Sequence, residues 1–146
     1  MASPTWVGVD SISDGARRLF PMIAPDPDAA WQAAHRAGTA AISTQLLKRG
    51  FRDTFLTGLQ TTRPDLRMVG YAFTLRYVPM REDLDLGPTD NRASIQRIAV
   101  ESVGPGDVLV IDIFGNLDAG GPIGDNLATG IYTFGKAGLV VDGAVR

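Results

Sequence analysis

The distribution of apolar residues along the chain predicts three β-strands. Over residues 69–77 apolar and polar residues alternate and several are aromatic, which is typical of a strand with one buried face. Residues 108–113 and 139–141 form almost continuous apolar runs, and such runs indicate strands that are buried on both faces of a sheet. We therefore expect a sheet whose core contains these three segments.

Helical patterns lie before the first of these strands. Residues 28–50 are rich in Ala, Leu and Gln, with Asp28 suited to cap the first turn and Gly50 suited to end the helix. The Gly-Thr pair near the middle divides this segment into two predicted helices, with Thr39 as the cap of the second. The first 28 residues mix polar and proline-rich pieces, so residues 1–28 are expected to form an N-terminal arm.

Two more helices are predicted between the strands. Residues 90–103 fit a helix that is capped by Asp90 or Asn91 and ends at a Gly-Pro-Gly sequence. Residues 124–138 fit a helix that follows a glycine-rich turn. Because strands and helices alternate over the second half of the chain, the predicted fold class is α/β, with a βαβ unit at the end.

Charge and composition exclude several kinds of protein. The 146 residues carry a net charge of −2 and no basic tract, so we expect no binding to nucleic acid. No basic segment followed by an apolar run opens the sequence, and no apolar run approaches the ~18 residues of a membrane span. We expect a soluble, cytoplasmic protein that makes no use of a membrane.

The scarce residue types narrow the chemistry further. The sequence has no cysteine and one histidine, His35, so thiolate chemistry and a multi-histidine zinc site are excluded within one chain. The only lysines are Lys48 and Lys136, and neither lies in a segment that looks buried enough to favour an imine mechanism. Arginine and aspartate are plentiful, and they suit the binding of small carboxylates and of a hard divalent cation.

A candidate ligand site follows from the last βαβ unit. In such units ligands bind beyond the carboxyl ends of the strands, beside the N-termini of helices. The sequence GGPIGDNL places free backbone N–H groups at a helix start, and Arg146 follows the last strand. These groups could hold a small carboxylate. The same residues also fit a plain turn beside a surface arginine, and spacing alone favours that plainer interpretation.

Three blocks of sequence add a resemblance. GPGDVLVID, GDNLA and GLVVDGAVR occur in this order at residues 104–112, 124–128 and 138–146, and they resemble the signature of the RraA-like family. The upstream segments GTAAISTQLLKRG and LRMVGYAFTLRYVP are similar to the opening helix and first core strand of that family. The likeness begins near Trp31, so residues 29–146 are interpreted as an RraA-like domain. It implies a swivelling β/β/α domain that assembles into homotrimers or hexamers.

The resemblance also implies a reaction and its site. Members of the family cleave a 4-hydroxy-2-oxo diacid, such as 4-hydroxy-4-methyl-2-oxoglutarate, to pyruvate, often with oxaloacetate decarboxylation. A divalent cation, Mg²⁺ or Mn²⁺, takes up the charge of the enolate. By position, Gly124, Asp125, Asn126 and Leu127 match the loop whose amides hold the pyruvate moiety. Arg146 matches the catalytic arginine that grips the same moiety.

One departure from the family leaves alternatives open. The metal-ligating aspartate of the family directly follows the arginine, so we expect the domain to be truncated at its C-terminal side, with no metal ligand in this chain. A non-catalytic regulator that binds ribonuclease E, or an inactive fragment, would also fit these residues. Asp112, Asp118 and Asp142 could supply ligands in a rearranged site, although strand ends and turns explain them more simply.

Overall fold

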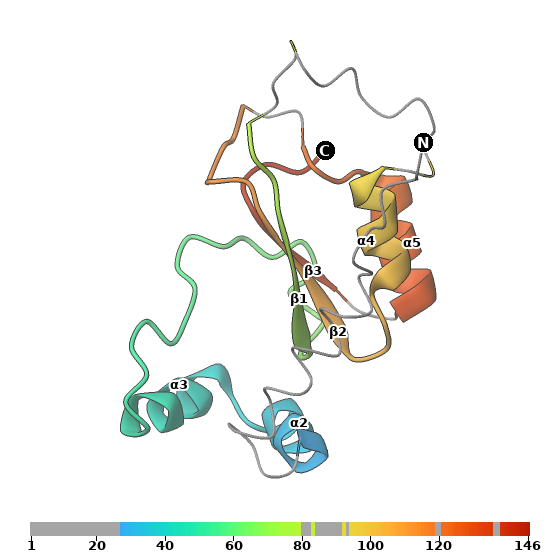
Figure 1. Cartoon of the computed structure of the whole chain (residues 1–146). Coiled ribbons are helices and arrows are strands. Elements are labelled where there is room, and N and C mark those ends of the chain that lie inside the picture. Colours follow the sequence, from blue (N-terminus) through green and yellow to red (C-terminus); the bar gives the residue numbers. More distant parts are fainter. Residues whose placement is uncertain (1–26, 80–82, 84–91, 93, 119–120, 136–137) are drawn as a thin grey trace, which may run out of the picture. The chain divides into compact units, whose positions relative to one another are not determined.

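A computed structural model describes residues 27–79, 83, 92, 94–118, 121–135 and 138–146 (Figure 1). The predicted N-terminal arm, apart from its last two residues, lies outside the described residues. The chain divides into two compact units, of which one contains the described residues up to Val69 and the other those from Gly70 onwards.

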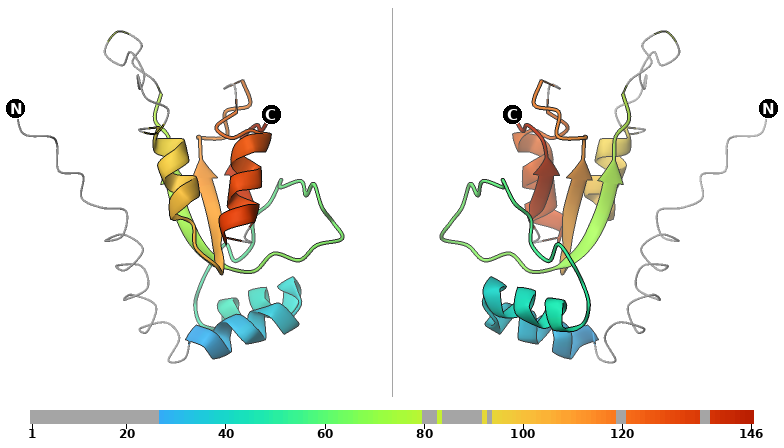
Figure 2. Two further views of the ribbon diagram at one scale, coloured as in Figure 1. Left: turned by 90° about the vertical axis from the view of Figure 1, so that its right-hand side faces the viewer. Right: turned by 90° about the vertical axis from the view of Figure 1, so that its left-hand side faces the viewer.

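The unit from Gly70 onwards is an α/β sheet with helices on one face. Its strands are β1 (Tyr71–Arg76), β2 (Asp107–Asp112) and β3 (Leu139–Asp142), which pair in parallel in the order β1-β2-β3. Between them run α4 (Ile95–Ser102) and α5 (Asp125–Gly135), and both helices lie on the same face of the sheet (Figure 2). The predicted α/β class and the three predicted strands are therefore confirmed.

The core of this unit lies between the sheet and its two helices. Leu109 and Ile111 of β2 and Ile131 of α5 are the largest fully buried side chains. Ala99 and Val100 of α4 pack into the same cluster. The central strand is the most buried of the three because it has a neighbour on each side, as its continuous apolar run predicted, whereas β3, which was also expected to be buried, is only partly buried.

The register of the sheet aligns the ends of its strands. Arg76 of β1 pairs with Asp112 of β2, and Asp112 pairs with Asp142 of β3. Successive side chains of a strand point to opposite faces, and the neighbouring residues Leu75 and Val141 pack against the helix-covered core. Three charged side chains therefore follow one another across the sheet, at its carboxyl edge and on the face away from α4 and α5.

The unit up to Val69 contains two short helices, α2 (Pro27–Arg36) and α3 (Thr39–Lys48). Their separation confirms the predicted division of the helical segment. No residue of α3 is buried. After α3, a hydrogen bond of 2.6 Å between the hydroxyl groups of Ser43 and Thr54 ties the following loop back to the helix.

The predicted caps of these helices are wrong. Asp28 lies inside the first turn of α2, which begins one residue earlier. Gly38 has an extended backbone and takes the N-cap position of α3. Thr39 is already helical, so its hydroxyl group does not lie where an N-cap side chain accepts a hydrogen bond from the first turn. No helix among the described residues is long and apolar enough to cross a membrane.

The helices of the sheet unit also begin and end inside the predicted ranges. The N-cap of α4 is Ser94, several residues after the predicted caps Asp90 and Asn91, which lie outside the described residues. Ser94 has the extended backbone of a cap but makes no capping hydrogen bond with its side chain. Gly135 is the last residue of α5, three residues before the predicted end. Helix ends are the least certain part of a prediction from propensity, because they depend on backbone angles.

We predict that Ile131→Ala lowers the free energy of unfolding by about 2–5 kcal/mol, because it leaves a cavity between α5 and the sheet. Tyr132→Ala is the matched control, since its side chain is 70% exposed on the same helix and should change stability by less than about 0.5 kcal/mol. Urea unfolding followed by circular dichroism measures both. Equal losses in the two variants would contradict this description of the core.

Candidate active site

The glycine-rich turn before α5 lies against Arg146. Gly121 has a φ of 72°, and a Cβ placed on it would lie 3.2 Å from the backbone nitrogen and 3.3 Å from Cγ of Arg146. A Cβ on Gly124 would lie 3.8 Å from Nε of the same arginine. The structure therefore brings together the turn and the arginine that the sequence singled out. Glycine at position 121 permits both the left-handed backbone and the close approach.

The start of α5 presents backbone donors beside this arginine. The first helical bond runs from the amide of Ala128 to the carbonyl oxygen of Gly124. Within the described part of the chain, the N–H groups of Gly124, Asp125 and Leu127 have no acceptor. The amide of Asn126 donates to the carboxylate of Asp125 over 2.8 Å. The helix start therefore offers three free amides. The fourth predicted amide, that of Asn126, is bound by the side chain of Asp125.

Arg146 is exposed at the same place. Within the described residues its guanidinium has no ion-pair partner. A free guanidinium next to free helix-start amides is an arrangement that can bind a small carboxylate through charge-assisted hydrogen bonds.

A side chain of α4 also holds the glycine-rich turn. Nε2 of Gln96 donates to the carbonyl oxygen of Pro122 over 2.8 Å. Tyr77, which follows β1, lies close to Gln96, and its hydroxyl is buried without a hydrogen-bond partner among the described residues. Burial raises the pKa of Tyr77, and the neighbouring amide of Gln96 offsets part of that rise. The turn is thus anchored to the first helix of the unit.

A tight turn follows β2 at the edge of the sheet. The amide of Asn116 donates to the carbonyl oxygen of Ile113, and the two residues between them, Phe114 and Gly115, have φ values of 58° and 63°. Two successive positive φ angles are what a type I′ turn requires, and they suit glycine. For a bulky residue such as phenylalanine this backbone costs about 1–2 kcal/mol.

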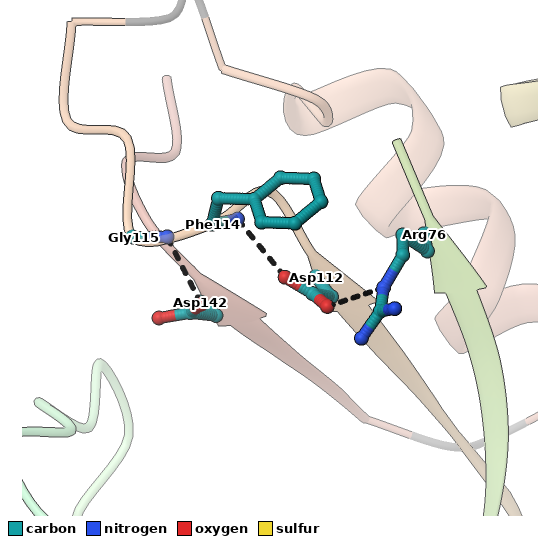
Figure 3. Close-up of polar contacts among 5 residues, drawn as sticks. All are labelled: Arg76, Asp112, Phe114, Gly115 and Asp142. Atoms are coloured by element: carbon teal, nitrogen blue, oxygen red, sulfur yellow. Dashed lines mark hydrogen bonds and ion pairs between the residues drawn. The ribbon is translucent and has the colours of Figure 1, made fainter. Parts of the chain in front are cut away.

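Two aspartates at the strand ends fix this turn (Figure 3). The amide of Phe114 donates to Oδ1 of Asp112, and the amide of Gly115 donates to Oδ2 of Asp142, each over 2.9 Å. Asp112 also accepts from Nε of Arg76 over 2.6 Å. The hydrogen bond from the amide of Phe114, together with that from Arg76, lowers the pKa of Asp112. Both aspartates therefore act as strand-end residues that bind the turn, as the simpler interpretation of the sequence held.

The described residues do not form a metal site by themselves. No three His, Cys, Asp or Glu side chains come together in the described ranges. Asp112 is engaged by the turn and by Arg76, whereas Asp118 uses its own amide to bind the side chain of Asn116. None of these carboxylates is assigned as a metal ligand.

The local surroundings of the remaining candidates do not suit catalysis. Lys48 is exposed at the end of α3, so it lacks the desolvation that an imine-forming lysine needs, and Lys136 lies outside the described residues. The ring of His35 packs edge-on against Trp31 at 4.0 Å between ring centroids, within α2. The structure therefore gives His35 a packing role, in agreement with the absence of any catalytic motif around it.

A comparison with protein families decides what this chain is. A family model described as RraA-like, Aldolase/RraA, matches residues 39–146, which is most of the sequence. The chain belongs to the RraA-like family. No curated protein and no solved structure matches it. The RraA-like match covers both the glycine-rich turn and Arg146, so the two features that meet in space lie within the recognised domain.

Sequence reasoning missed three residues of this RraA-like chain that shape the edge of the sheet. They are Arg76, Gln96 and Phe114, which contact Asp112, Pro122 and Arg76 respectively. The sequence feature that could have pointed to Arg76 is its position as a basic residue at the end of a predicted strand. Its meaning depends on the strand register, because that register places Arg76 opposite Asp112.

We predict that Asp112→Asn changes how stability depends on pH. A carboxyl whose pKa is lower in the folded state stabilises that state above its unfolded pKa, and this contribution disappears as the pH falls through the folded value. The urea midpoint of the wild type should therefore exceed that of Asp112→Asn at neutral pH, and the difference should shrink below pH 3.8.

All other titrating groups are shared by the two proteins, so the difference between their midpoints isolates Asp112. A difference that is independent of pH from neutrality down to about pH 2 would show that the ionised carboxylate does not hold the turn.

Proposed function

We propose that this protein is a divalent-metal-dependent aldolase. It cleaves a 4-hydroxy-2-oxo diacid, such as 4-hydroxy-4-methyl-2-oxoglutarate, to pyruvate, and it decarboxylates oxaloacetate in the same site. The observation that carries the proposal is the contact between the glycine-rich turn and Arg146, beside free amides at the start of α5. Membership of the RraA-like family, which includes aldolases, supports it.

The chemistry of this site suits a pyruvate-like group. Both proposed reactions break a carbon–carbon bond next to a ketone and leave a negatively charged enolate. The free amides of Gly124, Asp125 and Leu127 and the guanidinium of Arg146 are fixed donors for the carboxylate and keto oxygens of that group. Such donors stabilise the enolate more strongly than the neutral ketone, and this difference is what accelerates a reaction.

A divalent cation, Mg²⁺ or Mn²⁺, is part of the proposal because the described part of the chain offers no amine for an imine. Lys48 is exposed and therefore lacks the desolvation that an imine-forming lysine needs. When bound, the cation would supply Lewis-acid stabilisation of the enolate charge. Its ligands are not assigned, since the described residues bring no suitable set of side chains together. We also propose the swivelling β/β/α domain type and the homotrimeric or hexameric assembly.

The test is release of pyruvate from 4-hydroxy-4-methyl-2-oxoglutarate, followed with a coupled lactate dehydrogenase assay. In a protein that includes the aspartate ligand expected after Arg146, we predict turnover with Mg²⁺, loss of turnover with EDTA, and a decrease of kcat/KM by about 10²-fold or more for Arg146→Lys, because lysine cannot reproduce the forked donors of arginine. Arg97→Lys is the control, since Arg97 lies on α4 in an exposed pair with Glu101.

Turnover that survives EDTA, or an Arg146→Lys variant as active as the wild type, would contradict the proposal. If the protein binds oxalate but releases no pyruvate with any divalent cation, the non-catalytic role in binding ribonuclease E becomes the better interpretation.

A second prediction concerns the position of Arg146. Gly121→Ala should weaken oxalate binding by about 10-fold or more, because its Cβ would displace the backbone and Cγ of Arg146. Gly58→Ala is the matched control, since Gly58 has a similar φ of 78° but open space around it. Isothermal titration calorimetry measures the affinities.

Both glycine variants should lose about 1 kcal/mol of stability from backbone strain, and only Gly121→Ala should lose affinity. Equal oxalate affinity in the two variants would show that the contact between the turn and Arg146 does not position the arginine.

A further inference from the structure

Arg76 is a second arginine at the carboxyl edge of the sheet, and its side chain is held in place on one side only. Its Nε donates to Asp112 over 2.6 Å, which fixes the plane of the guanidinium (Figure 3). The side chain is still 68% exposed. Within the described residues the two terminal nitrogens have no partner, so four N–H donors remain available to a ligand.

Phe114 flanks the same guanidinium. The centre of its ring lies 5.6 Å from Cζ of Arg76, within the range of a cation–π contact. The ring is 62% exposed, although a left-handed backbone is unfavourable for phenylalanine. Backbone strain that holds an exposed aromatic side chain beside an ordered arginine is the kind of outlier from which a function can be inferred.

We infer that Arg76 binds the second carboxylate of the diacid substrate, the one remote from the ketone. This inference rests on the proposed function, in which Arg146 and the helix-start amides hold the first carboxylate. Arg76 is then a specificity residue that separates diacids from monoacids with the same keto-acid end, and Phe114 limits the directions from which the second carboxylate can approach.

The strand register supports the assignment of one carboxylate to each arginine. Arg76 ends β1 and pairs with Asp112, which pairs with Asp142 at the end of β3, and Arg146 follows four residues later. Neighbouring strands lie about 4.8 Å apart, so the backbones of Arg76 and Asp142 are separated by roughly 10 Å. Arg146 follows the end of β3, so the register places the two arginines at the same edge of the sheet.

Charge alone would not make Arg76 a good carboxylate site. Asp112 offsets its positive charge, and Asp142 lies one strand further along the sheet. Recognition therefore depends on the direction of the free N–H groups, which form a planar fork that fits a carboxylate. Arg76→Lys should therefore lose the preference for a ligand with a second carboxylate, as Arg76→Ala does.

The test compares three ligands by isothermal titration calorimetry on the full chain with Mg²⁺. Oxalate reports the keto-acid site alone. 2-Oxoglutarate carries a second carboxylate but has no 4-hydroxyl group, so it cannot undergo retro-aldol cleavage. 2-Oxopentanoate has the same carbon chain without the second carboxylate. We expect the wild type to bind 2-oxoglutarate at least about 10-fold more tightly than 2-oxopentanoate.

We expect Arg76→Ala to remove that preference and to leave the affinities for oxalate and 2-oxopentanoate within about 2-fold of the wild type. Arg97→Ala, which removes an arginine that is 48% exposed and paired through Nε with Glu101, should keep the preference. If Arg76→Ala keeps the preference, or weakens all three ligands equally, Arg76 does not bind the second carboxylate. If the wild type does not bind oxalate, the proposed function fails and this inference fails with it.

Discussion

Parallel pairing of β1, β2 and β3 decides where the functional groups of the sheet unit can lie. In parallel strands the carboxyl ends meet at one edge, and here the pairing is in register to the last residue of each strand. The loops that leave this edge carry the tight turn after β2, the glycine-rich segment before α5 and the chain that leads to Arg146. Groups that are far apart in sequence are therefore neighbours because of the sheet.

Hydrogen bonds hold both turns at this edge. Asp112 and Asp142 bind the two amides of the tight turn after β2. Gln96 binds the carbonyl oxygen of Pro122 in the glycine-rich turn. The strain of a left-handed phenylalanine, about 1–2 kcal/mol, is offset by these three hydrogen bonds, each worth about 1 kcal/mol. The edge can therefore keep free amides and free arginines in fixed places, which is the condition for recognising a charged substrate.

The sequence predicted the elements of the fold better than their ends. The strands were found because apolar runs of their length, bounded by glycine and proline, have few alternatives. The caps at Asp28 and Thr39 were wrong because helix starts depend on backbone angles that propensity does not determine. The turn and Arg146 were found together because both follow strands of one βαβ unit. Arg76 was missed because its partner, Asp112, is 36 positions away and only the register joins them.

The central claim is that the start of α5 and Arg146 hold a carboxylate, and nuclear magnetic resonance tests it most directly. Oxalate with Mg²⁺ would be titrated into the ¹⁵N-labelled protein. The account predicts saturable shifts of the amide signals of Gly124, Asp125 and Leu127, together with the side-chain Nε–H signal of Arg146. Unchanged signals from these four groups at saturating oxalate, or shifts confined to other parts of the chain, would contradict it.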